Sequence, residues 1–317
     1  MPNQSPIAKK IVEGAVREKP KGKKSVSYSQ YSIYKECPFR WQLTYKQGLF
    51  PFTSNINSVF GTSFHECLQE YLRLLYTVSV KASDEMNFEE YLSDRLLATY
   101  KDEMKENGGQ HFLPKEELKE YYHDGIQILD YLRRKRKVLF DYRQWDLVAI
   151  ELPLYTPILE GNDNILFNGY LDLLFYNPEE KIFRVLDIKT STRGWSAKYH
   201  HSDLLKMSQV LLYKHYLAKH YNLNPDDISG EYLIVKRKIM EDSEWPIPRH
   251  QTHIPAQGSA RIKLAVNGLE AFVKDVFNED GSFQEKEYPK HPSSSACKFC
   301  PYAGHPDMCD QKPGYNE

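Results

Sequence analysis

The chain has 317 residues, which is enough for one large domain or two modest ones with a buried core. Its 42 Lys and Arg residues face 43 Asp and Glu residues, which excludes a wholly basic surface but allows a local basic groove. No stretch approaches the roughly 20 apolar residues that span a bilayer. The N-terminus lacks the apolar run of a secretory signal, so we expect a cytoplasmic protein without a membrane partner.

The first 145 residues predict a basic tail followed by helices. Residues 1–26 are rich in Lys, Glu, Gly and Pro, which predicts a flexible basic tail; the alternative is an arm that contacts phosphates. Ser27 has the chemistry of a helix N-cap, and Pro38 is expected to bend or restart the helix that follows. Further helices are predicted at residues 61–76, 86–107 and 115–140.

From residue 146 the pattern changes to short β-rich runs. Strands are predicted at residues 146–155, 165–176, 181–189 and 231–238, and helices at 202–221 and 257–278. We therefore divide the chain into a helical region that carries Cys37 and His65 (27–145), an α/β core (146–287) and a Cys-rich irregular cap (288–317).

Two acidic residues and a lysine stand out in the predicted core. Asp187 and Lys189 are two apart on one strand, so their side chains share a face, and Asp172 lies on the neighbouring strand. Two carboxylates and a lysine that converge can hold a hard divalent cation and position a water for hydrolysis. The alternative is a set of solvated charges at strand ends. Asp187 follows the apolar pair Val185-Leu186, and a carboxylate emerging from a buried strand needs a partner or a metal.

The order of four short motifs resembles the PD-(D/E)XK nuclease superfamily, and most closely its RecB/AddB-like exonuclease branch. The motifs are GxxxH (Gly61 to His65), GYLD (Gly169 to Asp172), DIK (Asp187 to Lys189) and QxxxY (Gln209 to Tyr213). The resemblance covers roughly residues 27–310. It implies a restriction-endonuclease-like core, in which helices flank a mixed central sheet.

The resemblance also implies roles for individual residues. Asp172, Asp187 and Lys189 would be catalytic, with Gln209 and Tyr213 beside them. His65, Asp172, Asp187 and the carbonyl of Ile188 would bind Mg²⁺ or Mn²⁺. Glu151, in the preceding strand, is either a further acid of the site or an ordinary exposed glutamate. Without the resemblance, His65 and Tyr213 read as ordinary helix residues.

Four of the five cysteines form a second constellation. Cys297, Cys300 and Cys309 lie in the cap, and Cys37 lies about 260 residues upstream. Four thiolates suit either Zn²⁺ or a [4Fe–4S] cluster, and the one-plus-three split resembles the iron–sulfur variants of the nuclease family. The longer gap before Cys309 departs from that pattern and makes His305 an alternative ligand. Cys67 is expected to be a buried free thiol.

The resemblance implies a Mg²⁺- or Mn²⁺-dependent deoxyribonuclease of a bacterial or phage-infected cell. It would be an exonuclease that acts on single-stranded DNA or DNA ends in replication, recombination or repair. The alternative is a non-catalytic DNA-binding or scaffold subunit that keeps the nuclease fold. No P-loop motif is present, so unwinding would require a helicase or recombination partner. The DNA-binding candidates are Arg193, Trp195, Lys198, Lys236 and Arg237, with Lys35, Arg40, Lys206 and Lys238 as further cations.

Overall fold

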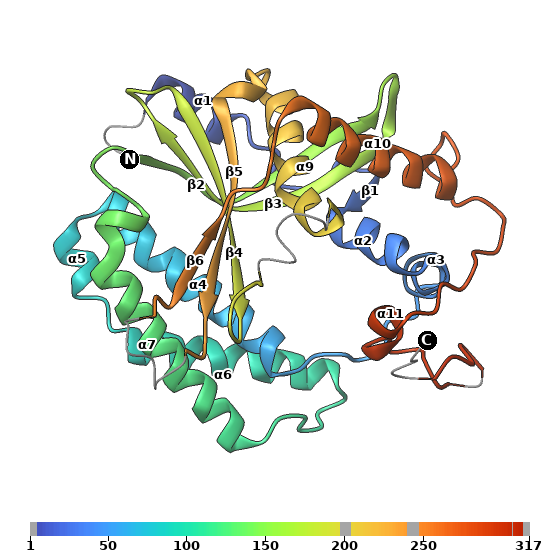
Figure 1. The fold of residues 1–317 in the computed structure, drawn as a ribbon, viewed down its shortest axis with the longest axis horizontal. Helices are drawn as coiled ribbons and strands as arrows, with labels where there is room; N and C mark the ends of the chain where they lie inside the picture. Colours follow the sequence, from blue (N-terminus) through green and yellow to red (C-terminus); the bar gives the residue numbers. More distant parts are fainter. Residues whose placement is uncertain (1–4, 197–203, 240–246, 306, 313–317) are drawn as a thin grey trace.

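A mixed β-sheet lies at the centre of the protein, as the computed structural model shows for residues 5–196, 204–239, 247–305 and 307–312 (Figure 1). Strand β3 pairs antiparallel with β2 and β4 and parallel with β1, while β5 pairs parallel with β4 and antiparallel with β6. The strands are β1 (Lys24–Ser27), β2 (Asp146–Leu159), β3 (Asn162–Asn177), β4 (Ile182–Ser191), β5 (Ile228–Lys236) and β6 (His250–His253). This confirms the predicted α/β class with a mixed central sheet flanked by helices.

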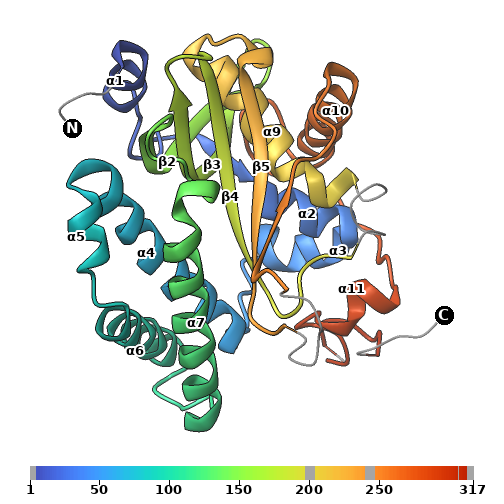
Figure 2. The same ribbon diagram turned by 60° about the vertical axis from the view of Figure 1, so that its left-hand side comes forward.

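Two groups of helices cover the two faces of the sheet (Figures 1 and 2). On one face the core is shared by α1 (Pro6–Glu13), α2 (Tyr28–Glu36), α9 (Leu204–Tyr221) and α10 (Ser259–Val276). On the other face a second core is shared by α4 (Ile56–Thr77), α6 (Phe88–Glu106) and α7 (Lys115–Leu139), with the short α5 (Val80–Asp84) beside them. No helix among the described residues is both long and apolar enough to cross a membrane.

The neighbours of β3 change halfway along its length. Residues 165–168 pair with β1, and residues 173–177 pair with β4. Between these two ladders, residues 169–172 pair only with β2 in the part of the chain that is described. The GYLD segment therefore lies in a fork of the sheet, where the backbone and side chains remain accessible to groups from other elements.

The prediction of a flexible tail at residues 1–26 is wrong for the described part of that range. Ser5 caps α1, in which Ala8 and Ile11 are fully buried against the sheet, and β1 extends the sheet beside β3. The prediction followed the Lys-rich composition of the segment, which also contains four apolar residues at helical spacing, Ile7, Ala8, Ile11 and Val12. Their burial outweighs the charged character of the segment.

The N-terminal helices meet the C-terminal segment around one tryptophan. Ser27 caps α2 as predicted, and Pro38 starts a new helix, α3 (Pro38–Trp41), which runs into a π-helical turn (Gln42–Lys46). Trp41 is fully buried, and its ring contacts Tyr288 and Phe283 at centroid distances of 5.2 and 5.8 Å. Within the described residues of the cap that follows, the one helix is the short α11 (Ser294–Lys298). The cap is therefore anchored at its start by aromatic packing.

Candidate active site

Helix α4 presents two polar residues to the sheet. The helix is capped by Asn55, and its apolar residues Phe64, Leu68, Leu72 and Leu75 are buried. His65 and Gln69 are four residues apart and so share the neighbouring face. This face looks onto the fork of β3, because both residues contact Asp172.

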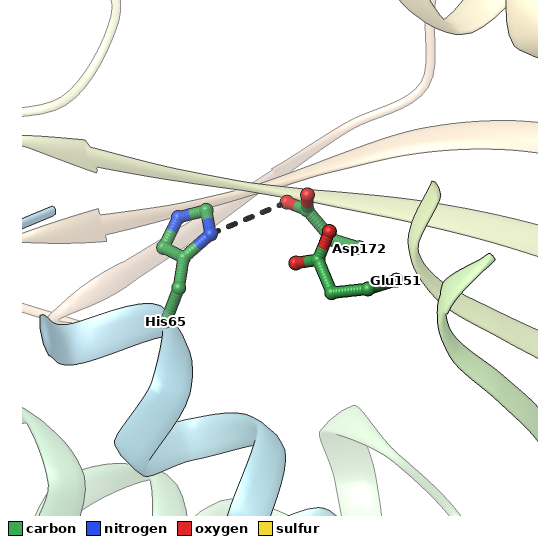
Figure 3. Close-up of side chains that lie close together, drawn as sticks. All are labelled: His65, Glu151 and Asp172. Carbon is green, nitrogen blue, oxygen red and sulfur yellow. Dashed lines mark ion pairs between the residues drawn. The ribbon is translucent and has the colours of Figure 1, made fainter. Parts of the chain in front are cut away.

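His65, Glu151 and Asp172 form a compact group in which each offers one ligand atom within 4.8 Å of the others (Figure 3). His65 Nδ1 lies 3.6 Å from Asp172 Oδ2, which also accepts a 2.7 Å hydrogen bond from the Ile188 backbone N–H. Gln69 Nε2 donates to Glu151 Oε1 at 2.6 Å. Glu151 thus belongs to the site, and Gln69 is a site residue that we did not predict.

Glu151 has an unusual backbone conformation. Its φ angle is +49°, in the middle of a β-strand, between residue pairs Ile150–Leu173 and Leu152–Leu171. The left-handed region costs a non-glycine residue of order 1–3 kcal/mol and persists where surrounding contacts enforce it. Here the left-handed φ angle places the Glu151 carboxylate opposite Asp172, where it accepts the hydrogen bond from Gln69.

Asp187 and Lys189 share one face of β4, as their spacing predicts. Lys189 Nζ lies 2.8 Å from Asp187 Oδ2, and the Asp187 side chain is 1% exposed. Asp187 Oδ1 is buried and has no hydrogen-bond partner among the described residues. A buried carboxylate oxygen without a partner is costly. This orphaned oxygen is what a bound cation would satisfy.

The acidic groups of the site have raised pKa values. Burial raises the pKa of Asp172 well above its usual range and the charge of Asp187 adds to this, while the Ile188 N–H and Lys189 act in the opposite direction. Burial also raises the pKa of Asp187, against the lowering effect of Lys189. The metal-free site therefore tends to retain protons that a cation would displace.

The two basic groups have pKa shifts that suit different roles. Burial and then the Lys189 charge lower the pKa of His65 to about 4, although its hydrogen bond with the Ile188 backbone acts to raise it. The imidazole is thus neutral at pH 7 and can be a ligand. Burial acts to lower the pKa of Lys189, but Asp187 and then Asp172 outweigh it and the net pKa is raised. Lys189 is therefore an ammonium cation.

Gln209 and Tyr213 lie on α9, and Tyr213 is near both Asp187 and Asp172. Gln209 Nε2 donates to the Tyr213 hydroxyl at 3.1 Å, and burial followed by the Asp187 charge raises the pKa of Tyr213. A side chain on Gly169 would place its Cβ 2.7 Å from the Tyr213 ring. Glycine at the start of GYLD is therefore what allows Tyr213 to pack against β3, and the tyrosine remains a protonated donor.

The donors present fit a hard divalent cation. The neutral imidazole of His65 and the carboxylates of Glu151 and Asp172 lie together and offer the nitrogen and oxygen ligands that Mg²⁺ or Mn²⁺ accepts; Asp187 is not part of this close group. Burial raises the pKa of Asp172 and of Asp187, and one oxygen of Asp187 has no partner among the described residues, so these carboxylates are not fully compensated within the protein. The residues thus satisfy the chemical requirements of a cation site.

The four cysteines singled out by spacing line one pocket between α3 and the cap. Cys37 stands in extended conformation at the junction of α2 and α3, so its side chain is free to meet Cys297, Cys300 and Cys309. His305 is exposed and is not among the residues that line this pocket. Cys67 is fully buried in α4, as expected. The chain thus brings together the set of thiols predicted from its sequence.

The predicted DNA-binding residues have different surroundings. Arg193 and Lys236 line a pocket of about 500 Å³ together with Lys238. Trp195 packs in a small apolar cluster with Met207, Val210, Tyr232 and Ile234. Lys198 lies outside the described residues.

Arg237 does not have the environment of a phosphate contact. Its side chain is 11% exposed and lies 2.7 Å from Asp124 and 2.9 Å from Glu120, both on α7. It also stacks on the ring of Tyr121. These contacts satisfy its charge within the fold, so Arg237 binds α7 to β5 and is removed from the DNA-binding set.

A mixed sheet with acidic residues on adjacent strands, a lysine beside them and a histidine on a covering helix defines a metal-dependent nuclease. The model of the PD-(D/E)XK nuclease superfamily matches residues 25–305, and the chain belongs to this superfamily. Its fold is accordingly of the restriction-endonuclease-like type, and DNA binding is implied. No curated protein matches the chain.

Proposed function

We propose that this protein is a Mg²⁺- or Mn²⁺-dependent DNA exonuclease of the RecB/AddB-like branch. The observation that carries this proposal is the convergence of His65, Glu151 and Asp172 next to the buried Asp187–Lys189 pair. His65, Asp172, Asp187 and the Ile188 carbonyl would hold the cation, with Glu151 as a further oxygen donor. A divalent cation at this position supplies charge neutralisation for the scissile phosphate and lowers the pKa of a water.

The protein's own residues supply the remaining requirements of phosphodiester hydrolysis. Lys189 is cationic and stands beside the acids, so it would neutralise charge on the phosphorane rather than accept a proton from water. Tyr213 remains protonated and would donate towards the same region, oriented by Gln209. The basic pocket of Arg193, Lys236 and Lys238 would hold the DNA backbone.

The test is digestion of singly end-labelled single-stranded and duplex DNA with Mg²⁺, with Mn²⁺ and with a chelator. The wild type is expected to release short products only with metal, and Asp187→Asn to lose about 10²-fold or more in rate. Asp163→Asn, at an exposed position near the start of β3, is the matched control and should cut normally. Circular single-stranded DNA should survive.

Three outcomes would overturn all or part of this assignment. Absence of cleavage by folded, metal-loaded wild type would favour the non-catalytic scaffold. Equal cleavage by Asp187→Asn would place the activity elsewhere. Rapid cutting of circular DNA would retain the nuclease but reject the exonuclease mode. In the exonuclease case, processing of DNA ends in replication, recombination or repair follows as the proposed cellular role, with a helicase or recombination partner.

We further propose that Cys37, Cys297, Cys300 and Cys309 hold a [4Fe–4S] cluster. All four line one pocket, yet among the described residues no three of these sulfurs lie within 4.8 Å of one another. A tetrahedral zinc site with Zn–S bonds of about 2.3 Å would require sulfurs about 3.8 Å apart. The wider spacing supports a larger group. Purified protein should absorb near 400 nm and contain iron and sulfide; colourless protein containing zinc would reject the cluster.

A further inference from the structure

One aromatic side chain lies close to His65, Glu151 and Asp172, which we call the acidic group, and has no role in the catalysis described above. Tyr170, two residues before Asp172 on β3, is 43% exposed, although both of its chain neighbours are buried. Leu171 faces the core shared with α9, and a Cβ on Gly169 would meet the Tyr213 ring on that same side. Tyr170 therefore points to the opposite face of the strand, the face on which Asp172 meets His65.

The Tyr170 ring is held in position by a second tyrosine. Its hydroxyl forms a 2.9 Å hydrogen bond with the hydroxyl of Tyr155 on β2, and Tyr155 is only 8% exposed. Tyr170 pairs with Pro153, and Tyr155 pairs with Asn168, so the two tyrosines are diagonal neighbours across the ladder. Fixing the hydroxyl restricts the ring while leaving its surface exposed.

An exposed, fixed aromatic ring suits a nucleobase. Two residues along a strand correspond to about 7 Å, so the backbone position of Tyr170 lies one strand repeat from that of Asp172. Every nucleobase offers a flat surface that stacks on an aromatic side chain without regard to sequence. Burial, with the Tyr170 hydrogen bond, raises the pKa of Tyr155 to about 12, so its hydroxyl is neutral at working pH and does not repel DNA.

We propose that Tyr170 is a stacking platform for the base of a nucleotide next to the scissile phosphate, and so positions the strand over the acidic group. This inference rests on the proposed nuclease function. Stacking on an unpaired base requires single-stranded or frayed DNA at this point, so Tyr170 would favour single strands and DNA ends over intact duplex.

The first experiment measures binding separately from cleavage. The affinity of single-stranded DNA is measured by fluorescence anisotropy, with a chelator present, for wild type, Tyr170→Ala, Tyr170→Phe and Tyr170→Trp. Tyr170→Ala should bind about 5- to 150-fold more weakly, whereas the two aromatic variants should bind nearly as well as wild type. Leu264→Ala, at an exposed site on α10, is the surface control.

The second experiment uses DNA with a single abasic site placed at successive positions from the labelled end. Removing the stacked base should weaken binding and raise the KM of the wild type at one position, with little change in kcat. In Tyr170→Ala the same abasic site should have no further effect, because the ring and the base act as a pair.

The platform is rejected if Tyr170→Ala binds as wild type does, if Tyr170→Phe loses as much affinity as Tyr170→Ala, or if the abasic and Ala effects are additive. Should Tyr170→Ala fail to fold, Tyr170→Leu, which keeps an apolar side chain but has no aromatic surface, takes its place in both experiments with the same expected results. Because binding is measured without metal, a protein that binds DNA through Tyr170 but never cuts it would separate this inference from the nuclease proposal.

Discussion

The Asp172 carboxylate contacts or lies near several other groups of the site. One carboxylate oxygen accepts the Ile188 N–H and lies near His65, while Asp187 repels its charge. Burial and then the Asp187 charge favour a proton or a cation on Asp172 over the bare carboxylate, although the Ile188 N–H and Lys189 act against them. The position of Asp172 thus favours ligand binding and reduces the stability of the ligand-free protein, as is common for functional sites.

Asp172→Asn is therefore expected to stabilise the metal-free protein while abolishing cleavage. Because the folded-state pKa of Asp172 is raised, the wild type loses stability as pH rises through that pKa, whereas Asn does not titrate and can still accept the Ile188 N–H. Thermal unfolding in chelator should give a higher Tm for Asp172→Asn than for wild type. At a pH above the pKa of Asp172 the increase should be about 2 to 4 °C for each kcal/mol of added stability, and at pH 4 it should be smaller. A lower Tm at every pH would contradict this account.

At the scale of elements, helix α7 and the strands β5 and β6 are joined by buried charge. Arg237 bridges Asp124 and Glu120, and Lys238 lies 3.0 Å from Asp124. Arg249, just before β6, donates to Gln127 on α7. These contacts connect the helical core of one face to the far edge of the sheet, which carries the basic pocket.

Arg237→Ala should therefore reduce stability more than DNA binding. Asp124 would keep only Lys238 as a partner, so we expect a loss of about 1–3 kcal/mol, less than that for a fully isolated buried charge. Lys238→Ala, at a more exposed side chain, should cost less than about 1 kcal/mol. Urea unfolding measures both variants. A large fall in DNA affinity with unchanged stability would restore Arg237 to the DNA-binding set.

The elements that sequence predicted are those with long periodic patterns. The five longest helices and β2 to β5 were predicted to within a few residues, apart from an early end for β2 and a late start for α4. β1 and β6 have four residues each, too few for an alternating pattern, and are strands because a neighbour supplies their hydrogen bonds. Such tertiary pairing leaves little trace in local sequence.

The candidate site was predictable where spacing fixes direction, and less so elsewhere. Asp187 with Lys189 and Gln209 with Tyr213 share faces, as their intervals require. The role of Glu151 was ambiguous, because the orientation of its side chain depends on a left-handed φ angle. Such an angle is usually indicated in a sequence by glycine, and this position is a glutamate. Gln69, four residues after His65, had the correct helical interval to be predicted. In sequence Arg237 resembles its cationic neighbours, and its burial distinguishes it: its side chain is 11% exposed, whereas that of Lys238, which pairs with the same α7 carboxylates, is 41% exposed.

At the scale of the whole molecule, the segment that follows α2 meets the cap, about 250 residues later in the sequence. Cys37 follows α2, which packs in the core shared with α9 and α10, and its sulfur accepts a 3.5 Å contact from the backbone N–H of His291, 254 residues later. The cap is connected to the rest of the fold by aromatic packing around Trp41, by the thiol pocket and by the hydrogen bonds of the Tyr302 hydroxyl with Thr44 and Leu49.

Cys37→Ser should therefore prevent binding of the proposed iron–sulfur cluster and loosen the cap, while the sheet remains folded. We expect loss of absorbance near 400 nm and early proteolysis after residue 288, with the far-UV circular dichroism of the core retained. Cys67→Ala, which changes a buried thiol outside the pocket, is the control and should keep the absorbance. A variant that keeps both absorbance and protease resistance would exclude Cys37 as a ligand.

The pairing of β1 with β3 also sets an order for folding during synthesis. Lys23 and Asn164 are 141 residues apart yet hydrogen-bonded, so β1 emerges from the ribosome long before its partner exists. Until then α1 and α2, whose apolar residues are buried against later elements, have nothing to pack against. Contacts this distant in sequence form slowly, because a long loop must close first. The nascent chain therefore cannot assemble the acidic group early, and the nuclease centre forms only after most of the protein has been made.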